Sequence, residues 1–209
     1  MKALISEYNK KKSKIKKRLQ EFECRGRAKD EDIFEELCFC LFTPQSKAVS
    51  CDKALKRLRK RGLLLKGSGK AVRGELSGVR FPNNKTAYLL AARKLFKEGK
   101  GIGVTRRIDK NDIIKTREWL VENVKGFGYK EASHFLRNIG LGKDLAILDV
   151  HILRNLKKCG VIKEFLTSIS RKRYMEIEDK MRAFAKRLDI PLGELDLLFW
   201  SMGTGIIFK

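Results

Sequence analysis

The sequence lacks the long apolar runs that membrane proteins contain. None of its 209 residues lies in a run approaching the ~18–20 apolar residues that a spanning helix needs. The N-terminal stretch places isolated isoleucines and leucines among many lysines, which is too polar for the apolar part of a secretory signal peptide. We therefore expect a cytoplasmic protein with no membrane partner.

Cysteine and histidine are too few and too irregularly placed for a metal site. The sequence has two histidines and five cysteines, at positions 24, 38, 40, 51 and 159. Cys38 and Cys40 lie in an apolar run, and helical residues two apart point in different directions, so they make a poor metal pair. An odd number of cysteines is typical of free thiols in a reducing compartment. We expect all five cysteines to pack in the core and His134 to face the DNA or the solvent. For His151 we favour a packing or capping role over that of a general base.

Acidic residues are also scarce, with 25 Asp and Glu against 48 Lys and Arg, a net charge of +23 and a pI near 10.0. Because 43% of the residues are hydrophobic, the chain can bury a core and is not disordered. A charge this large repels itself and points to an anionic partner, either a nucleic acid or a membrane surface. For the lysine-rich N-terminus we favour the solvated face of a DNA-binding protein over an interfacial membrane helix.

Proline occurs three times, and alternating strand patterns are few. Apolar residues instead recur at helical intervals through most of the chain. The predicted helices cover residues 33–42, 46–61, 85–97, 109–123, 129–139, 151–158, 171–188 and 192–202. A glycine-rich stretch, residues 62–84, interrupts them. The predicted fold class is all-α with short loops.

Two glycines, Gly126 and Gly128, separate two of these predicted helices. Glycine permits a tight turn that would strain other residues, and such a turn points backbone N–H groups outward at the start of the next helix. This arrangement suits a phosphate, and Lys125 adds positive charge beside it. The alternative is an ordinary helix corner in which glycine serves as a C-cap.

With its surroundings, this segment resembles the helix–hairpin–helix of a large superfamily of DNA glycosylases. In the bifunctional members a lysine stands two residues after the second hairpin glycine, and an aspartate lies nineteen residues beyond it. Lys130 and Asp149 occupy these positions. The resemblance implies that Lys130 attacks C1′ of the damaged nucleotide. It also implies that the Asp149 carboxylate stabilises positive charge on the sugar and orients the nucleophile.

The chemistry is consistent with these residue types and needs no metal or cofactor. A neutral lysine amine can displace the base and form a Schiff base, which then permits β-elimination of the abasic strand. Desolvation and neighbouring positive charge both favour the neutral amine. Asp149 also precedes a predicted helix and is placed to cap it, a role compatible with the first.

Gln45 and Phe81 resemble two further positions of the superfamily. The stretch around Gln45 looks like the turn after the first core helix, where Gln or Asn is set against the DNA. The stretch around Phe81 looks like the loop that carries a wedge residue. A wedge offsets part of the cost of flipping a nucleotide out of the duplex. The alternatives are a helix cap for Gln45 and a core residue beneath a turn for Phe81.

Within the superfamily, the chain resembles the small archaeal-type 8-oxoguanine DNA glycosylase/AP lyases. It lacks the four-cysteine cluster motif of the endonuclease III-like branch and the extra β-domain of the eukaryotic-type enzymes, and it ends in a lysine. The resemblance implies that Lys209 takes part in recognising the base, on which Trp200 or Phe208 could stack. The alternative is a frayed polar terminus.

These features predict a two-lobed helical protein with the active site in the cleft between its lobes. Residues 33–141 would form a bundle carrying the hairpin, and residues 1–32 with 142–209 the second lobe, so that Lys130 and Asp149 face each other. We expect a nucleoid-associated monomer that acts on double-stranded DNA containing oxidised guanine or abasic sites. A glycosylase for another lesion (an oxidised pyrimidine or a mismatched base) and a non-enzymatic helix–hairpin–helix DNA-binding protein stay open as alternatives.

Overall fold

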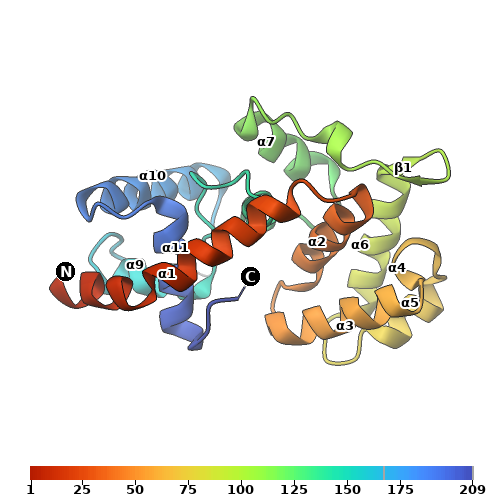
Figure 1. Ribbon diagram of the computed structural model, residues 1–209, viewed down its shortest axis with the longest axis horizontal. Coiled ribbons are helices and arrows are strands. Elements are labelled where there is room, and N and C mark those ends of the chain that lie inside the picture. The colour runs from red at the N-terminus through yellow and green to blue at the C-terminus, as the bar shows by residue number, and fades with distance from the viewer. Residues whose placement is uncertain (167, 209) are drawn as a thin grey trace. The chain divides into compact units, whose positions relative to one another are not determined.

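A computed structural model describes residues 1–166 and 168–208, and helices dominate it (Figure 1). The contacts divide the chain into two units. Unit 1 contains Met1–Gly26 and the chain from Leu136 onward, and unit 2 is Arg27–Phe135. Unit 1 holds helices α1 (Lys2–Arg25), α9 (Val150–Lys158), α10 (Arg171–Arg187) and α11 (Leu192–Thr204).

Unit 2 holds the remaining elements apart from one helix that crosses the division. They are α2 (Asp30–Phe42), α3 (Ala48–Lys60), α4 (Leu63–Lys66), α5 (Gly69–Glu75), α6 (Pro82–Leu95), strands β1 (Lys97–Glu98) and β2 (Gly101–Ile102), the 3₁₀ helix η1 (Thr105–Arg107) and α7 (Ile113–Asn123). Helix α8 (Tyr129–Asn138) begins in unit 2 and ends in unit 1. The all-α prediction is confirmed, since the two strands form only a two-residue antiparallel pair.

Unit 1 is built around α11, which contacts α1, α9 and α10 (Figure 1). Its residues from Leu192 to Phe199 are all buried, as expected for a helix that is apolar on nearly every side. Two of them are acidic and have partners. The Glu194 carboxylate, for example, accepts a hydrogen bond of 2.7 Å from the Tyr8 hydroxyl of α1.

Unit 2 is built around α2, which contacts α3, α6 and β2. Residues Ile33–Phe42 of this helix are buried with the exception of Glu35. At its start the Asp30 carboxylate accepts from the backbone amides of Val104 and Thr105, at 2.6 and 2.7 Å. This bond ties the first turn of α2 to the end of the β-hairpin, and so α2 as a whole belongs to unit 2.

The boundaries of the units differ from the expected 33 and 141. Unit 2 begins at Arg27 because Asp30 is bound within it, and it ends at Phe135. The next residues of the chain pack against α1: the Arg137 guanidinium lies 4.9 Å from the centre of the Phe22 ring. The glycine-rich stretch 62–84 also differs from the expectation, because it contains α4 and α5. The Ser68 hydroxyl caps α5 by accepting from the Ala71 amide at 3.3 Å.

The cysteines and histidines follow the predictions in part. Cys38, Cys40 and Cys51 are buried, and burial raises the pKa of the Cys51 thiol to about 11. Cys24 and Cys159 are exposed, so the prediction of core packing is wrong for these two. Cys24 lies on α1 outside the buried stripe of that helix, and Cys159 ends α9.

His134 was expected on the surface, and this prediction is wrong. Its ring is buried and meets the Phe39 ring edge-on, with 5.8 Å between the ring centres. Across residues 1–166 and 168–208, no helix is long and apolar enough to cross a membrane. Within the same residues, no group of three His, Cys, Asp or Glu side chains is arranged to hold a metal ion.

Candidate active site

The hairpin between α7 and α8 is a tight turn, as its two glycines predict. The Phe127 amide donates to the Val124 carbonyl at 2.9 Å, and the Phe127 ring is buried against Phe135. Gly126 has φ of 95°, and a Cβ there would lie 2.6 Å from the Tyr88 ring. Both the backbone conformation and the space therefore require glycine at position 126.

The backbone amide of the second hairpin glycine is bonded by a side chain of the helix that follows it. The Gly128 amide donates to Glu131 Oε2 at 3.2 Å, and the Gly128 carbonyl accepts from the Ala132 amide at 3.0 Å. A glutamate that reaches back from the third helical position is the acidic half of a capping box. One backbone donor that we expected to be open to a phosphate is thus taken by a carboxylate, while the exposed Lys125 remains at the turn.

Lys130 is the second residue of α8, and its side chain is 21% exposed. Its Nζ lies 3.6 Å from Glu131 Oε1, on the carboxylate that caps the helix. Its charge also acts on a second lysine. The pKa of Lys85 is lowered to about 8, chiefly because that ammonium is buried, and the positive charges of Lys130 and Arg80 act in the same direction. Lys130 therefore belongs to a basic group within unit 2.

Lys85, on α6, anchors the end of α2 and the loop that follows it. Its buried ammonium donates to the carbonyl of Phe42, to the carbonyl of Pro44 at 2.8 Å and to Ser46 Oγ at 2.8 Å. Ser46 Oγ also accepts from the Arg80 amide at 2.9 Å. We call Lys85 and Ser46 the loop clamp. It joins the loop 43–47 after α2 to the loop 76–81 before α6.

The loop clamp lies beside both residues that were predicted to touch DNA. Gln45 and Phe81 have left-handed backbone conformations, with φ of 55° and 57°. Such angles are uncommon for residues other than glycine and are maintained only where the surroundings impose them. Phe81 is 48% exposed, and the Arg80 guanidinium lies over its ring, 5.2 Å from the ring centre. Phe81 is thus not a core residue, and Gln45 is exposed and caps no helix.

Asp149 caps α9, as the sequence predicts. Its Oδ1 accepts from the amides of His151 and Ile152 at 2.8 and 2.9 Å. Both bonds use the same oxygen, so Oδ2 is not committed to the cap. Asp149 belongs to unit 1 and Lys130 to unit 2, and their juxtaposition stays a prediction.

The two aromatic side chains that are predicted to recognise the base, Trp200 and Phe208, both belong to the C-terminal part of unit 1 and have different partners there. The His151 ring meets the Trp200 ring edge-on at 6.4 Å, which is the packing role expected for this histidine. The Phe208 carbonyl accepts from Arg18 Nε of α1 at 2.6 Å, and the Arg18 guanidinium lies 5.8 Å from the Phe208 ring centre. The tail is therefore anchored as far as Phe208, while Lys209 lies outside the described residues.

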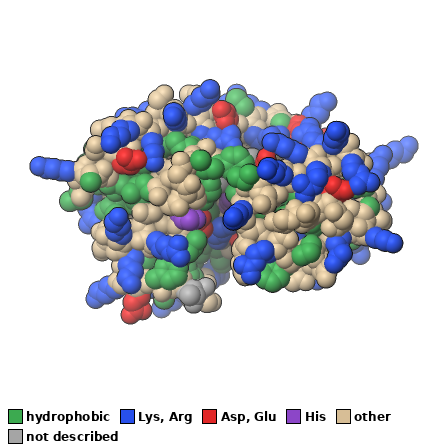
Figure 2. All heavy atoms as spheres, turned by 90° about the horizontal axis from the view of Figure 1, so that it is seen from below, with side chains coloured by type: hydrophobic (Ala, Val, Ile, Leu, Met, Phe, Trp, Pro, Cys, Tyr) green, Lys and Arg blue, Asp and Glu red, His purple; other side chains and the backbone are tan. Residues whose placement is uncertain are grey.

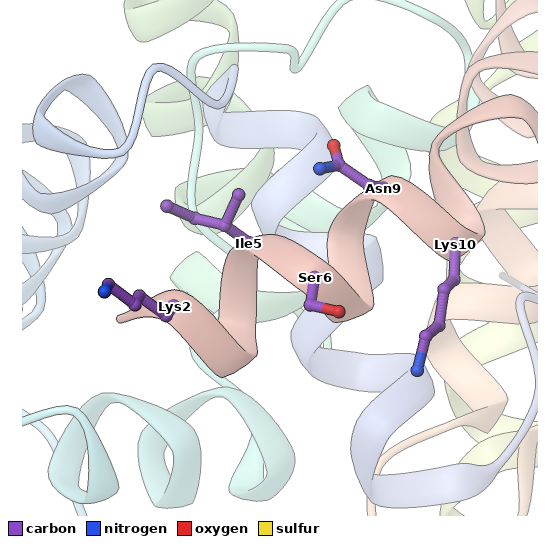
Figure 3. A pocket seen from close by; sticks show the side chains of 5 residues that line it. All are labelled: Lys2, Ile5, Ser6, Asn9 and Lys10. Atoms are coloured by element: carbon purple, nitrogen blue, oxygen red, sulfur yellow. The ribbon is translucent and has the colours of Figure 1, made fainter.

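The exposed side of α1 carries surface depressions that contain none of these residues. One is lined by Lys2, Ile5, Ser6, Asn9 and Lys10 (Figure 3). An adjoining one is lined by Asn9, Lys12, Ser13, Lys16, Lys17 and Gln20. Figure 2 shows that Lys and Arg side chains are spread over the visible face and that Asp and Glu are sparse there. The basic surface thus extends beyond the residues predicted to perform chemistry.

Three residues of this arrangement were not found by sequence reasoning. Glu131 had a signal, because a glutamate three residues after Gly128 fits a capping box. Lys85 and Ser46 had none, since neither belongs to a motif and lysine is common throughout the chain. Lys85 and Ser46 are 39 residues apart in sequence, and Arg80 and Ser46 are 34 residues apart, so no local pattern joins them.

Comparison with known proteins agrees with the resemblance drawn from the hairpin. Residues 15–190 match the Ogg-HhH family, described as 8-oxoguanine DNA glycosylase. An 8-oxoguanine DNA glycosylase/AP lyase of Fusobacterium nucleatum is 44% identical over 204 residues, covering 97% of this chain and 94% of the relative. One from Korarchaeum cryptofilum is 42% identical over 197 residues, covering 93% and 90%.

Solved structures give the same result. The crystal structure of the 8-oxoguanine DNA glycosylase of Thermotoga maritima has a TM-score of 0.88 and 34% identity, covering 100% of this chain and 97% of that one. The Methanocaldococcus jannaschii 8-oxoguanine glycosylase/lyase, in complex with a 15mer DNA containing 8-oxoguanine, also scores 0.88 at 34% identity, covering 99% of this chain and 100% of that one. The chain belongs to the 8-oxoguanine DNA glycosylase family.

Proposed function

We propose that this protein is a bifunctional DNA glycosylase/AP lyase that excises 8-oxoguanine from double-stranded DNA as a monomer. The observation that carries the proposal is the position of Lys130. It follows the hairpin at the start of α8, and most of its side chain is shielded from solvent. Its positive charge contributes to lowering the pKa of Lys85. A lysine amine that is held at the start of a helix beside the hairpin, with limited access of water, can serve as the nucleophile of a glycosylase/lyase.

The proposed reaction proceeds in two steps on this lysine. Lys130 Nζ attacks C1′, the glycosidic bond breaks, and its electron pair leaves with the base, which takes up a proton. The amine then forms a Schiff base with the opened sugar, and loss of a C2′ proton expels the 3′ phosphate by β-elimination. The Asp149 carboxylate stabilises the positive charge that develops on the sugar, through the oxygen that the helix cap does not use.

We assign Gln45 and Phe81 to the DNA duplex. An exposed aromatic ring held by a left-handed backbone can fill the gap that a flipped nucleotide leaves. The Gln45 amide can donate to and accept from the widowed partner base. The hairpin at Gly126 and Gly128, with Lys125, would contact the phosphate backbone. We assign stacking on the oxidised base to Trp200 or Phe208 and a part in recognising this base to Lys209.

Borohydride trapping tests the proposal directly. Duplexes carrying 8-oxoguanine, thymine glycol, an abasic site or no lesion are incubated with the protein, with and without borohydride. We expect covalent adducts with the 8-oxoguanine and abasic duplexes, and none with the Lys130→Gln variant. Lys94→Gln, on the exposed side of α6, is the matched control and should form the adduct. Adducts that persist in Lys130→Gln would refute the assignment of the nucleophile.

The same gel separates the alternatives. A stronger adduct with thymine glycol than with 8-oxoguanine would support a glycosylase for another lesion. Binding of every duplex without any adduct would support a DNA-binding protein that is not an enzyme. Asp149→Asn keeps a capping oxygen and removes the charge, so we expect the melting temperature to be retained and most base excision to be lost. Full excision by this variant would remove the electrostatic role.

A further inference from the structure

The segment Leu145–Leu148, which leads into Asp149, is buried but has no regular secondary structure. Buried backbone N–H groups need acceptors, and outside helices and sheets these must come from elsewhere. Each amide from Leu145 to Asp149 has one. The Leu145 amide donates to the Gly142 carbonyl at 3.1 Å and the Asp149 amide to the Ile147 carbonyl at 2.6 Å. The three amides between them donate to side chains.

These three side chains come from the helices packed around the segment. Glu178 Oε2 of α10 accepts from the Ala146 amide at 2.8 Å, and Asp196 Oδ1 of α11 accepts from the Ile147 amide at 3.1 Å. The Tyr174 hydroxyl of α10 accepts from the Leu148 amide at 3.3 Å and donates to the Ala146 carbonyl at 2.6 Å. We call Tyr174, Glu178 and Asp196 the amide clasp. All three are buried.

Arginines orient the two carboxylates of the amide clasp. Arg182 Nη2 lies 3.5 Å from Glu178 Oε1, and Arg137 Nη1 lies 3.6 Å from Asp196 Oδ2. Each carboxylate therefore bridges a guanidinium and a backbone amide, and hydrogen bonds to ionised acceptors are the stronger kind. Arg137 lies near the end of α8, the helix whose second residue is Lys130.

Buried charge of this kind is an expensive way to gain stability. Removing two carboxylates from water costs free energy that ion pairing only partly returns, and apolar side chains often cover a segment at lower cost. What polar contacts provide that apolar contacts do not is direction, because a hydrogen bond fixes the position of the amide that donates it. The amide clasp fixes three consecutive peptide groups immediately before Asp149.

We infer that the amide clasp positions the Asp149 carboxylate for the chemical step. The inference rests on the proposed function of Asp149. The helix cap holds Asp149 from its C-terminal side, through the His151 and Ile152 amides, and the clasp holds the chain from its N-terminal side. Tyr174, Glu178 and Asp196 are positioning residues, since the contacts described above are made to the backbone that leads into Asp149.

Two buried tyrosines provide a matched pair of variants. Tyr174→Phe removes the hydroxyl that bridges Leu148 and Ala146, whereas Tyr8→Phe removes one that donates to Glu194 elsewhere in unit 1. Both should lower the melting temperature by similar amounts. Only Tyr174→Phe should slow single-turnover excision of 8-oxoguanine, by about 10- to 100-fold, because small misplacements of a catalytic group have effects of that size. The dissociation constant for the DNA should be unchanged in both.

A double variant shows whether the effect passes through Asp149. In an Asp149→Asn background, with the slow reaction followed to completion, adding Tyr174→Phe should change the excision rate by less than about twofold. Contributions that act through one group are strongly non-additive, whereas independent ones multiply. A loss that persists at full size in this background would overturn the inference.

A second site guards against a variant that does not fold. Glu178→Gln keeps an acceptor for the Ala146 amide and Glu178→Ala does not. The excision rate of the folded protein should therefore be highest in the wild type, lower in Glu178→Gln and lowest in Glu178→Ala. Equal rates across this series, or a Tyr174→Phe variant as fast as wild type, would overturn the inference alone. An Asp149→Asn variant as fast as wild type would overturn the proposed role of Asp149 and the inference with it.

Discussion

The ammonium of Lys85 donates to the hydroxyl of Ser46 at 2.8 Å, and this bond holds the loop 43–47 against α6. The same hydroxyl accepts from the Arg80 amide, next to Phe81, and it lies one residue after Gln45. Phe81 and Gln45 have left-handed backbones that neither residue type favours. The loop clamp therefore supplies the rigidity that the proposed roles of Phe81 as wedge and Gln45 as base reader need.

Lys85→Met should reduce excision without unfolding the protein. Methionine fills a similar volume but makes none of the three hydrogen bonds of the ammonium, so the loop 43–47 loses its anchor on α6. Ser46, which accepts from the Arg80 amide of the loop 76–81, is then held less firmly. Because burying an ammonium is costly, we expect the melting temperature to stay level or rise. Excision of 8-oxoguanine should fall about 10-fold or more, and cleavage at a preformed abasic site should fall less, because no base has to be flipped there.

Lys94→Met, on the exposed side of α6, is the control for this change. It alters the charge by the same amount and leaves the loop clamp in place. Excision and abasic-site cleavage are measured in parallel under single-turnover conditions. If Lys85→Met and Lys94→Met behave alike on both substrates, the clamp has no functional role.

Lys85 also predicts how stability depends on pH. Its pKa is about 8 in the folded protein against 10.5 for an unperturbed lysine, so between these values the unfolded chain binds more protons. Its contribution to stability therefore rises as the pH rises through this window and is lost as the pH falls to about 8. The full difference corresponds to about 3 kcal/mol.

This pH dependence is isolated by comparison with Lys85→Met. Denaturant unfolding of both proteins at about pH 7 and about pH 10 cancels the other titrating groups, which the two chains share. The stability of the wild type relative to Lys85→Met should increase toward the higher pH. A difference that is the same at both values would show that the ammonium is not desolvated.

Gly126→Ala should destabilise the hairpin for two separable reasons. The residue has φ of 95°, and its new Cβ would lie 2.6 Å from the Tyr88 ring. Gly62 also has a positive φ, 64°, but a Cβ added there would have no neighbouring atom within 4 Å. Gly62→Ala therefore measures the backbone strain alone, about 1 kcal/mol, and Gly126→Ala should cost at least about 1 kcal/mol more.

Chemical denaturation gives both free energies of unfolding, and binding to undamaged DNA gives a second readout. Gly126→Ala should weaken that binding as well, since the turn carries Lys125 and the hairpin amides. Equal destabilisation by the two variants would mean that Tyr88 moves aside at no cost.

The parts of the site that the sequence predicts are those encoded by neighbours in the chain. The hairpin follows from Gly126 and Gly128, and the cap at Asp149 follows from an acceptor placed before a helical run. The short helices of the stretch 62–84 were missed because its glycines outweighed the local signal of Ser68, which caps α5. His134 was misplaced because the face that α8 turns toward α2 depends on tertiary packing.

The remaining parts depend on contacts between distant residues, and no local pattern encodes them. Asp30 looks like a helix-start residue, yet its carboxylate binds amides 74 and 75 residues away. Lys85 is one lysine in a lysine-rich chain, and its role appears only once the loops around it are assembled. Glu178 and Asp196 look like the polar positions of ordinary helices, although both are buried against the chain before Asp149.

Phe81→Ala should impair excision from duplex DNA while leaving the fold intact. The ring is 48% exposed, so its removal costs little packing and the melting temperature should change by only a few degrees. Stacking of an aromatic ring on a base contributes about 1–3 kcal/mol, which predicts a loss of about 5- to 150-fold in excision from the duplex. Single-stranded DNA has no gap to fill, and its slower excision should be nearly unaffected. Ile114→Ala, at another exposed apolar side chain of unit 2, is the control. An equal loss on both substrates would assign Phe81 to general DNA binding, because a wedge acts only where a duplex has to be held open.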